Sequence, residues 1–424
     1  MPLQNLIIPA NASSFADFLN NIADSPKPGY VGPRAIFNPH YIPPKILVQR
    51  KKAELVYGIL KDALEDEYSS NLTVYGLQGA GKNLLINLIF QWLSAHDVIV
   101  DIGKNSPIII LNDCKDQALG QFLFNILQNL NDKLAHQLDL QESLQWDAIT
   151  MWNTFKYLVK KSPRSIILYL SQIESMEEGV IAKVLNFAKS LDKLHVVTTI
   201  NTGNHFYAFN QYSGLDHRIL MNSLRSSDLY EITRQRADMA FHPWLEKDAI
   251  KLIVDYIIEY GTKVPGSCIS MLKHLYPIVE EQGNLTAEDI RKVSQYYFEG
   301  VSIDSLTITD YIMQTRWEER LFLDYLVNYF QNSSRFYIPG KEIQRAYQMT
   351  AEEMGFTQKS HDMLQMLTNI TRSEILLPSH FSQKSGADKI WVEDQATLSL
   401  HYLSMPVEEV NQVLEFGFGI IPEK

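Results

Sequence analysis

The segment GLQGAGKN at positions 76–83 holds the residues best suited to chemistry. Its spacing is G-x-x-x-x-G-K, with a further glycine at Gly79, and it lies between a predicted strand and a predicted helix. Glycines let backbone amides curl around phosphate oxygens, the helix start adds its dipole, and Lys82 supplies a cation. We therefore predict a phosphate-binding loop; the alternative is a relic that keeps its shape and binds nothing. The residues predicted to line it are Gly76, Gly79, Ala80, Gly81, Lys82, Asn83 and Leu84.

The last position of this motif departs from the usual pattern. A Ser or Thr hydroxyl normally ligates Mg²⁺ there, and this chain has Asn83. An amide oxygen can ligate magnesium, but its reach differs from that of a hydroxyl. The sequence therefore leaves Mg²⁺ binding through Asn83 open.

A second set of chemical groups is expected after the apolar run IILYL. An ATP-hydrolysing site of this kind needs an acid that holds magnesium and an acid that orients water. Here the run ends in Ser171 and Gln172, and neither can act as a carboxylate. Glu174 is the nearest acid and could substitute, or it could serve only to favour a helix start. After a later strand, Asn201 could contact a terminal phosphate or be a turn residue. No catalytic residue is assigned beyond these two candidates.

The elements around these residues alternate between strands and helices. Apolar runs at 71–76, 107–112, 165–170 and 195–200 predict strands, and helical spacing is present at 46–66, 84–93, 120–134, 150–161 and 179–191. Such alternation indicates parallel strands covered by helices on both faces. We predict an irregular N-terminal arm over 1–44 and an α/β nucleotide-binding domain over 45–222.

The strand signal stops after residue 222. Helical periods at 229–241, 248–260, 268–281 and 286–298 predict a helical lid over 223–304. Helices at 317–330, 340–354 and 360–370, with short strands at 374–378 and 389–393, predict a winged helix over 305–424. The apolar end EFGFGIIPEK could pack on its own domain or insert into a partner.

Composition limits the class of protein. The 424 residues carry a net charge of −11, which repels polyanions on average, so DNA binding would need a local basic patch. The two cysteines, Cys114 and Cys268, lie far apart and indicate a reduced, intracellular compartment. The sequence predicts neither a signal peptide nor a membrane span.

Taken in order, these motifs resemble the origin-recognition and cell-division-cycle initiator family of AAA+ ATPases, in its archaeal form. The resemblance covers most of the chain from about residue 36. It rests on FNPHYIPP (37–44), VQRKKAEL (48–55), SNLTVYGLQGAGKN (70–83), IILNDC (109–114), IILYLSQIE (166–174), TTINT (198–202), LDHRI (215–219) and RADMAFHP (236–243).

The resemblance implies a fold and a set of ligands. The fold is an AAA+ P-loop domain with a parallel sheet, a helical lid and a C-terminal winged helix. The ligand is ATP or ADP, and the partners are related AAA+ subunits, double-stranded DNA and the replicative helicase. Asn201 matches the polar sensor, and Arg218 and Arg225 are candidates for an arginine that acts on a neighbouring subunit. The family's acid pair is replaced by Ser171-Gln172, and its lid arginine is missing from PGSCISML (265–272).

The predicted winged helix has few cations for a DNA-binding module, since acids outnumber Lys and Arg over 305–424. Its expected recognition helix is near 357–370. The candidate DNA contacts are Lys359, Ser360 and His361 in that helix and Lys384 and Lys389 in the wing. A winged helix can also dock protein, and the sequence leaves both roles open.

We therefore predict a replication-initiator paralog that binds ATP or ADP with little or no hydrolysis, a pseudo-ATPase. It would work in the nucleoid of a prokaryote or in a eukaryotic nucleus. The alternatives are a non-replicative AAA+ scaffold or regulator whose winged helix docks protein, and a DNA-binding transcription or mobile-element regulator.

Overall fold

The computed structural model describes residues 14–20, 22, 29–38, 41–95, 106–134, 145–203, 212, 214–382 and 399–419. They belong to two compact units, which are Met1–Lys27 with Ile42–Ser223, and Pro28–Tyr41 with Leu224–Lys424. The first unit contains the predicted phosphate-binding loop. The second contains the predicted lid and winged helix.

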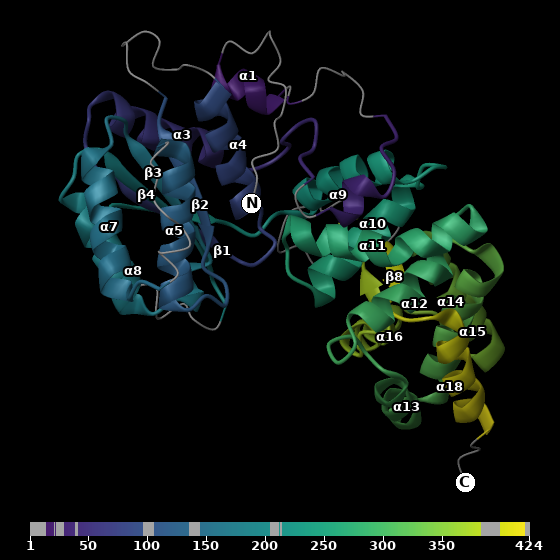
Figure 1. Cartoon of the computed structure of the whole chain (residues 1–424). Helices are drawn as coiled ribbons and strands as arrows, with labels where there is room; N and C mark the ends of the chain where they lie inside the picture. Colours follow the sequence, from purple (N-terminus) through teal and green to yellow (C-terminus); the bar gives the residue numbers. More distant parts are fainter. Residues whose placement is uncertain are drawn as a thin grey trace. The chain divides into compact units, whose positions relative to one another are not determined.

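A five-stranded parallel sheet forms the centre of the first unit (Figure 1). The strand order is β2-β3-β4-β1-β5. The strands are β1 (Asn71–Gly76), β2 (Ile108–Asp113), β3 (Ile166–Ser171), β4 (Leu194–Asn201) and β5 (His217–Met221). The four predicted strands are confirmed, and β5 is an additional strand at the edge of the sheet. In this order the carboxyl ends of β3, β4 and β1 are adjacent, at the edge where α/β folds bind ligands.

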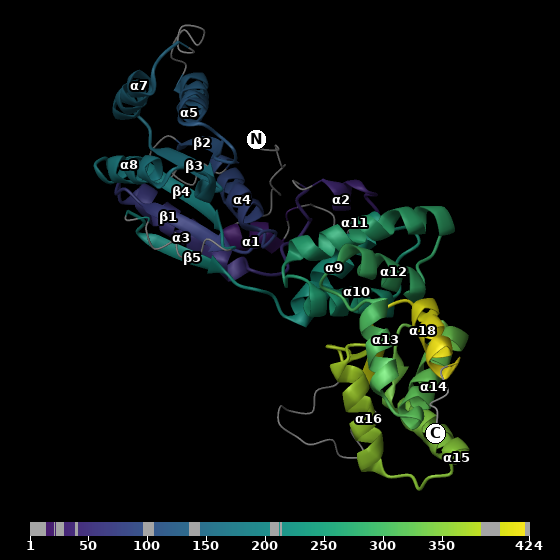
Figure 2. The same cartoon turned by 90° about the horizontal axis from the view of Figure 1, so that it is seen from below.

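Helices cover both faces of this sheet. One face packs against α5 (Leu119–Leu134), α7 (Ala148–Lys161) and α8 (Glu178–Lys189), which lie together on one side of the strands in Figure 2. On the other face lies α4 (Lys82–Ala95), whose Phe90 ring packs edge-on against Tyr169 of β3 with centroids 5.5 Å apart. Beside α4 lie α3 (Arg50–Glu65) and the short α1 (Phe15–Asn20). Burial of each large apolar side chain in these layers contributes about 1.5–3 kcal/mol.

Helices make up most of the lid in the second unit (Figure 1). They are α9 (Ser226–Ala240), α10 (Lys247–Tyr260), α11 (Pro265–Gln282) and α12 (Ala287–Tyr297). A segment of the N-terminal arm, α2 (Arg34–Phe37), joins them. The buried Arg236 guanidinium of α9 donates to the carbonyls of Ala35 and Tyr41, at 2.9 and 3.3 Å. The arm predicted as irregular therefore includes two short helices, α1 in the first unit and α2 in the second.

The C-terminal part of the second unit has the element order of a winged helix. After α13 (Ser305–Gln314) come α14 (Trp317–Ser333), β6 (Ile338–Pro339), α15 (Gly340–Met354), α16 (Ser360–Arg372), β7 (Leu376–Pro378), β8 (Leu400–Leu403) and α18 (Val407–Gly419). The three strands form an antiparallel sheet of order β6-β8-β7. The strand predicted at 389–393 lies outside the described residues. The described part of the apolar C-terminal end, up to Gly419, packs on its own domain, because Gly417 of α18 lies against Ile312 and Phe418 contacts Trp317.

Two buried histidines predict how stability depends on pH. His195 of β4 and His401 of β8 are 0% and 1% exposed, and burial lowers the pKa of each ring to about 4. A histidine in the unfolded chain takes up a proton below about pH 6.5, whereas these rings in the folded chain stay neutral down to about pH 4. Each histidine should therefore lower the free energy of unfolding by about 1.4 kcal/mol per pH unit as pH falls through that window.

The slope can be measured by denaturant unfolding at several pH values between 7 and 4. His195→Leu should remove its contribution from the first unit, and His401→Leu should remove its own from the second. Equal slopes in the wild type and both variants would contradict this prediction.

Candidate functional site

The predicted phosphate-binding loop is a strand-to-helix turn between β1 and α4. Its backbone needs glycine at three points, because φ is +154° at Gly76, +80° at Gly79 and +92° at Gly81. A Cβ atom at Gly76 would also come within 2.6 Å of the Met221 carbonyl oxygen on β5. The Ala80 amide donates to the Leu77 carbonyl within the loop, at 3.2 Å. The spacing of the motif therefore predicted the loop's place and its conformation.

Lys82 is buried at the first position of α4. Its ammonium donates to the carbonyls of Gly76 and Leu77, both at 2.8 Å, and the residue is 6% exposed. Burial lowers the pKa of Lys82 to about 8, and the charge of Glu174 opposes that shift. Backbone carbonyls therefore hold the Lys82 ammonium at the start of the loop, where it is available to attract a polyphosphate.

Asn83 is tied to the sheet by its side-chain oxygen. Its Oδ1 accepts a hydrogen bond from the Tyr169 hydroxyl at 3.0 Å and from the Thr199 hydroxyl at 3.4 Å. This oxygen is the atom that would have to ligate Mg²⁺. Nor do the described residues hold any group of three or more His, Cys, Asp or Glu side chains suited to a metal ion. The site does not fit a magnesium ion held in the usual way.

A carboxylate that the sequence reasoning missed lies beside the predicted acid-pair positions. Ser171 Oγ and Gln172 Nε2 both donate to Asp113 Oδ1, at 2.9 and 3.3 Å. Asp113 ends β2 and pairs with Ser171 in the register of β2 and β3. The signal was available, since Asp113 directly follows the predicted strand 107–112, but the neighbour of that strand in the sheet was unknown. Asp113 is thus held by neutral donors from both substituted positions.

Glu174 and Asn201 are in direct contact. Glu174 lies in the short 3₁₀ turn η2 (Ile173–Ser175), and its Oε1 accepts from the Asn201 backbone amide at 3.1 Å and from Asn201 Nδ2 at 2.6 Å. Asn201 pairs with Gly76 in the register of β1 and β4. Three predicted site residues, Lys82, Glu174 and Asn201, are therefore gathered at the carboxyl edge of the sheet.

The two arginine candidates belong to different units. Arg218 lies on β5 in the first unit, is exposed, and donates to the Tyr212 carbonyl at 3.4 Å. Arg225 is the exposed N-cap residue of α9 in the second unit. Their action on a neighbouring subunit stays a prediction.

The candidate DNA contacts are exposed where they are described. Lys359, Ser360 and His361 lie at the start of α16, and His361 is near Asp362, with Nδ1 and Oδ1 3.7 Å apart. Lys384 and Lys389 lie outside the described residues. The start of α16 therefore carries one lysine and one acid, which is a weak electrostatic surface for a polyanion.

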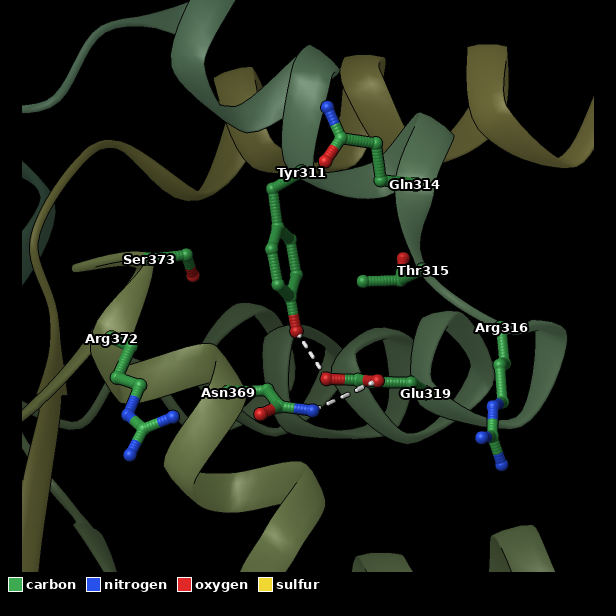
Figure 3. Close-up of a pocket in the computed structure, with 8 residues that line it drawn as sticks. All are labelled: Tyr311, Gln314, Thr315, Arg316, Glu319, Asn369, Arg372 and Ser373. Atoms are coloured by element: carbon green, nitrogen blue, oxygen red, sulfur yellow. Dashed lines mark hydrogen bonds between the residues drawn. The ribbon is translucent and has the colours of Figure 1, made fainter.

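A pocket of about 420 Å³ lies between α13, α14 and α16 (Figure 3). At its base the buried Glu319 accepts from the Tyr311 hydroxyl at 2.6 Å and from Asn369 Nδ2 at 3.5 Å. Burial and the Glu319 carboxylate both raise the pKa of Tyr311. Arg316 and Arg372 point away from Glu319 in Figure 3. These bonds join three helices, so the cluster is explained by domain packing, and it holds no residue of the predicted site.

A glycine loop after the first strand of a five-stranded parallel sheet defines the P-loop class of α/β folds. Among the helices of the described residues, none is both long and apolar enough to cross a membrane. No protein-family model matches the chain. In sequence, it is 24% identical over 226 residues to an ORC1-type DNA replication protein of Pyrococcus horikoshii, and equally so to that of Pyrococcus abyssi. The match covers 50% of this chain and 52% of each relative. The chain therefore spans about half the length of the relatives it matches.

The fold is similar to that of solved initiator structures. Cdc6p from Pyrobaculum aerophilum has a TM-score of 0.65 and 14% identity, over 91% of this chain and 98% of that protein. A Drosophila ORC chain, in a structure described as bound to DNA, has a TM-score of 0.50 and 12% identity, over 98% and 95%. The chain therefore has the AAA+ fold of the Cdc6 and ORC proteins, and its predicted resemblance to that family is confirmed.

Proposed function

We propose that this chain is a replication-initiator paralog that binds ATP or ADP with little or no hydrolysis and assembles with related subunits on DNA. The observation that carries the proposal is the glycine loop, with its left-handed backbone and the buried Lys82 ammonium beside it. Such a loop offers amides and a cation to a polyphosphate. The nucleotide would then act mainly as a structural ligand, inside the cell, in a nucleoid or a nucleus.

The groups around the loop support weak or absent hydrolysis. The position of the magnesium hydroxyl holds Asn83, whose oxygen is engaged, and the acid pair is Ser171 and Gln172. Loss of one preorganised group that stabilises charge in a transition state costs about 10²–10³ in rate. Several such losses together leave little stabilisation of the transition state for transfer of the terminal phosphoryl group.

A calorimetric titration of the purified full chain with ADP, paired with a phosphate-release assay with ATP, tests the nucleotide part of the proposal. Bound nucleotide should stabilise the fold by mass action, by about 2.7 kcal/mol at a ligand concentration of 100 times Kd. Phosphate release should stay near background. ATP turnover of about once per second, a normal enzymatic rate, would refute the proposal of a pseudo-ATPase.

The DNA and subunit parts of the proposal rest on the relatives. The Pyrococcus proteins are named as DNA replication proteins, and the Drosophila ORC structure is described as bound to DNA. On this acidic chain, α7 supplies a local cationic surface, since it carries Lys156, Lys160 and Lys161 and no acid. We therefore expect duplex DNA to contact the lysines of α7 as well as the winged helix. Either Arg218 or Arg225 would face the nucleotide of a neighbouring subunit.

Fluorescence anisotropy with a duplex at about 50 and 200 mM salt separates this proposal from its competitor. Phosphate contacts release counterions, so DNA affinity should fall steeply as salt rises. The competing function, a non-replicative AAA+ scaffold whose winged helix docks protein, is favoured by the weakly charged start of α16. It predicts no salt-dependent DNA binding and no co-purifying initiator subunit.

A further inference from the structure

Glu174 places a fixed carboxylate beside the phosphate-binding loop. We propose that this carboxylate takes the position of a terminal phosphate, so that the loop selects a nucleoside diphosphate over a triphosphate. The inference rests on the proposed nucleotide binding and goes beyond it, because it assigns a discriminating role to one side chain.

The geometry of the strand ends brings the carboxylate to this position. Asn201 lies directly opposite Gly76 in the register of β1 and β4, and the Thr202 amide donates to the Gly76 carbonyl at 3.0 Å. The Lys82 ammonium bonds to that same carbonyl oxygen at 2.8 Å. Glu174 is held beside this pair of strand ends through its two hydrogen bonds from Asn201. A carboxylate and an ammonium therefore converge where the loop begins.

The hydrogen-bonding groups that a terminal phosphate would use are already engaged. The side-chain amide of Asn201 is the polar group at the tip of β4, and its Nδ2 donates to Glu174 Oε1 at 2.6 Å. The Glu174 carboxylate also accepts a hydrogen bond from the Asn201 backbone amide. A third phosphate would have to displace Glu174 from both donors, whereas a diphosphate needs only the loop amides and Lys82.

The second carboxylate oxygen of Glu174 adds an electrostatic reason, besides the steric one, for the exclusion of a third phosphate. Glu174 Oε2 is buried and has no hydrogen-bond partner among the residues that the structure describes. The negative charge of Glu174 acts to raise the pKa of Lys82 and so opposes the larger lowering caused by burial. A desolvated negative charge repels another one strongly, because the local dielectric is low. A triphosphate would bring a further anionic group against this oxygen.

A divalent cation has little means of compensating for that repulsion. In Mg²⁺-dependent sites the metal bridges the β- and γ-phosphates and neutralises their charge. Here Asn83 Oδ1 is engaged by Tyr169 and Thr199, and the acid-pair positions carry Ser171 and Gln172. Diphosphate binding should therefore be insensitive to Mg²⁺, and added Mg²⁺ should not restore triphosphate affinity.

Calorimetric titrations of the full chain with ADP and with a non-hydrolysable ATP analogue, each in Mg²⁺ and in EDTA, test the proposal. The wild type should bind ADP at least about tenfold more tightly than the analogue, a difference of about 1.4 kcal/mol. Glu174→Gln keeps an oxygen that can accept from Asn201 and removes the charge, so the ratio of the two affinities should approach one. The matched control is Glu177→Gln at the exposed N-cap of α8, which should bind like the wild type.

The outcomes separate this inference from the proposed function. Equal binding of both nucleotides by the wild type, or an unchanged ratio in Glu174→Gln, would overturn exclusion by Glu174 while leaving nucleotide binding intact. Absence of ADP binding by the wild type would refute both. The wild-type ratio and its response to Mg²⁺ need no variant, so the inference stays testable even if Glu174→Gln does not fold.

Discussion

Replacing Lys82 with alanine is expected to weaken ADP binding about 100-fold or more. The ammonium is the cation that the described residues place at the loop, and it already bonds to the carbonyls of Gly76 and Leu77. Hydrogen bonds that involve a charged group contribute about 1.5–3 kcal/mol, and about 2.7 kcal/mol corresponds to a factor of about 100 in affinity. Titration calorimetry of the two proteins with ADP measures the change.

The pH dependence of binding shows whether charge is responsible. Because burial lowers the pKa of Lys82 to about 8, its ammonium loses its proton above that pH in the free protein. Wild-type affinity for ADP should then fall as pH rises from 8 towards 10, and the affinity of Lys82→Ala should not show that fall. Lys61→Ala, at a largely exposed ion pair with Glu65 on α3, is the control and should bind normally. Unchanged affinity in Lys82→Ala would identify the loop as a relic.

The phosphate-binding loop could be predicted from sequence because its determinants are contiguous. Eight consecutive residues at 76–83 encode the strand end, the turn and the helix start, and three glycines there adopt positive φ. Long helices with 3.6-residue periodicity were equally clear, as in α10 and α14. These features depend on local spacing, which a single sequence displays in full.

The features that sequence reasoning missed depend on neighbours distant in the chain. The edge strand β5 has the mixed burial pattern of HRILM, so it lacks the continuous apolar run that marked the other four. Asp113 and Ser171 are 58 residues apart, and their contact follows from the order of β2 and β3 in the sheet. Only the fold reveals that Glu174 bonds to Asn201, 27 residues away.

The helix α13 shows a different reason for a missed element. Its sequence, SLTITDYIMQ, contains several β-branched residues, which disfavour a helix on intrinsic propensity. Tertiary packing overrides that preference, since Ile308 and Ile312 are buried and Gly417 of α18 lies against Ile312. The same contact accounts for Gly417 in the C-terminal helix, where a Cβ would lie 2.4 Å from the Ile312 side chain.

Removal of the Asp255 carboxylate should destabilise the second unit by about 3–5 kcal/mol, the cost of breaking a buried polar cluster. Asp255 lies on the apolar lid helix α10 and is 0% exposed. Its Oδ2 accepts from the Tyr337 hydroxyl at 2.9 Å and the Ser379 hydroxyl at 2.6 Å. Its Oδ1 accepts from the His380 amide at 2.9 Å. Asp255→Ala leaves these donors buried without an acceptor.

The same carboxylate connects α10 to Ser379 and His380, the two residues that directly follow β7. Asp255→Ala should therefore lower the denaturant midpoint of the second unit and increase hydrogen exchange in both α10 and β8. Asp248→Asn, at an exposed position in the first turn of α10, is the matched control and should change stability by less than about 0.5 kcal/mol. If exchange rose only in α10, the carboxylate would stabilise its own helix without holding the strands β7 and β8.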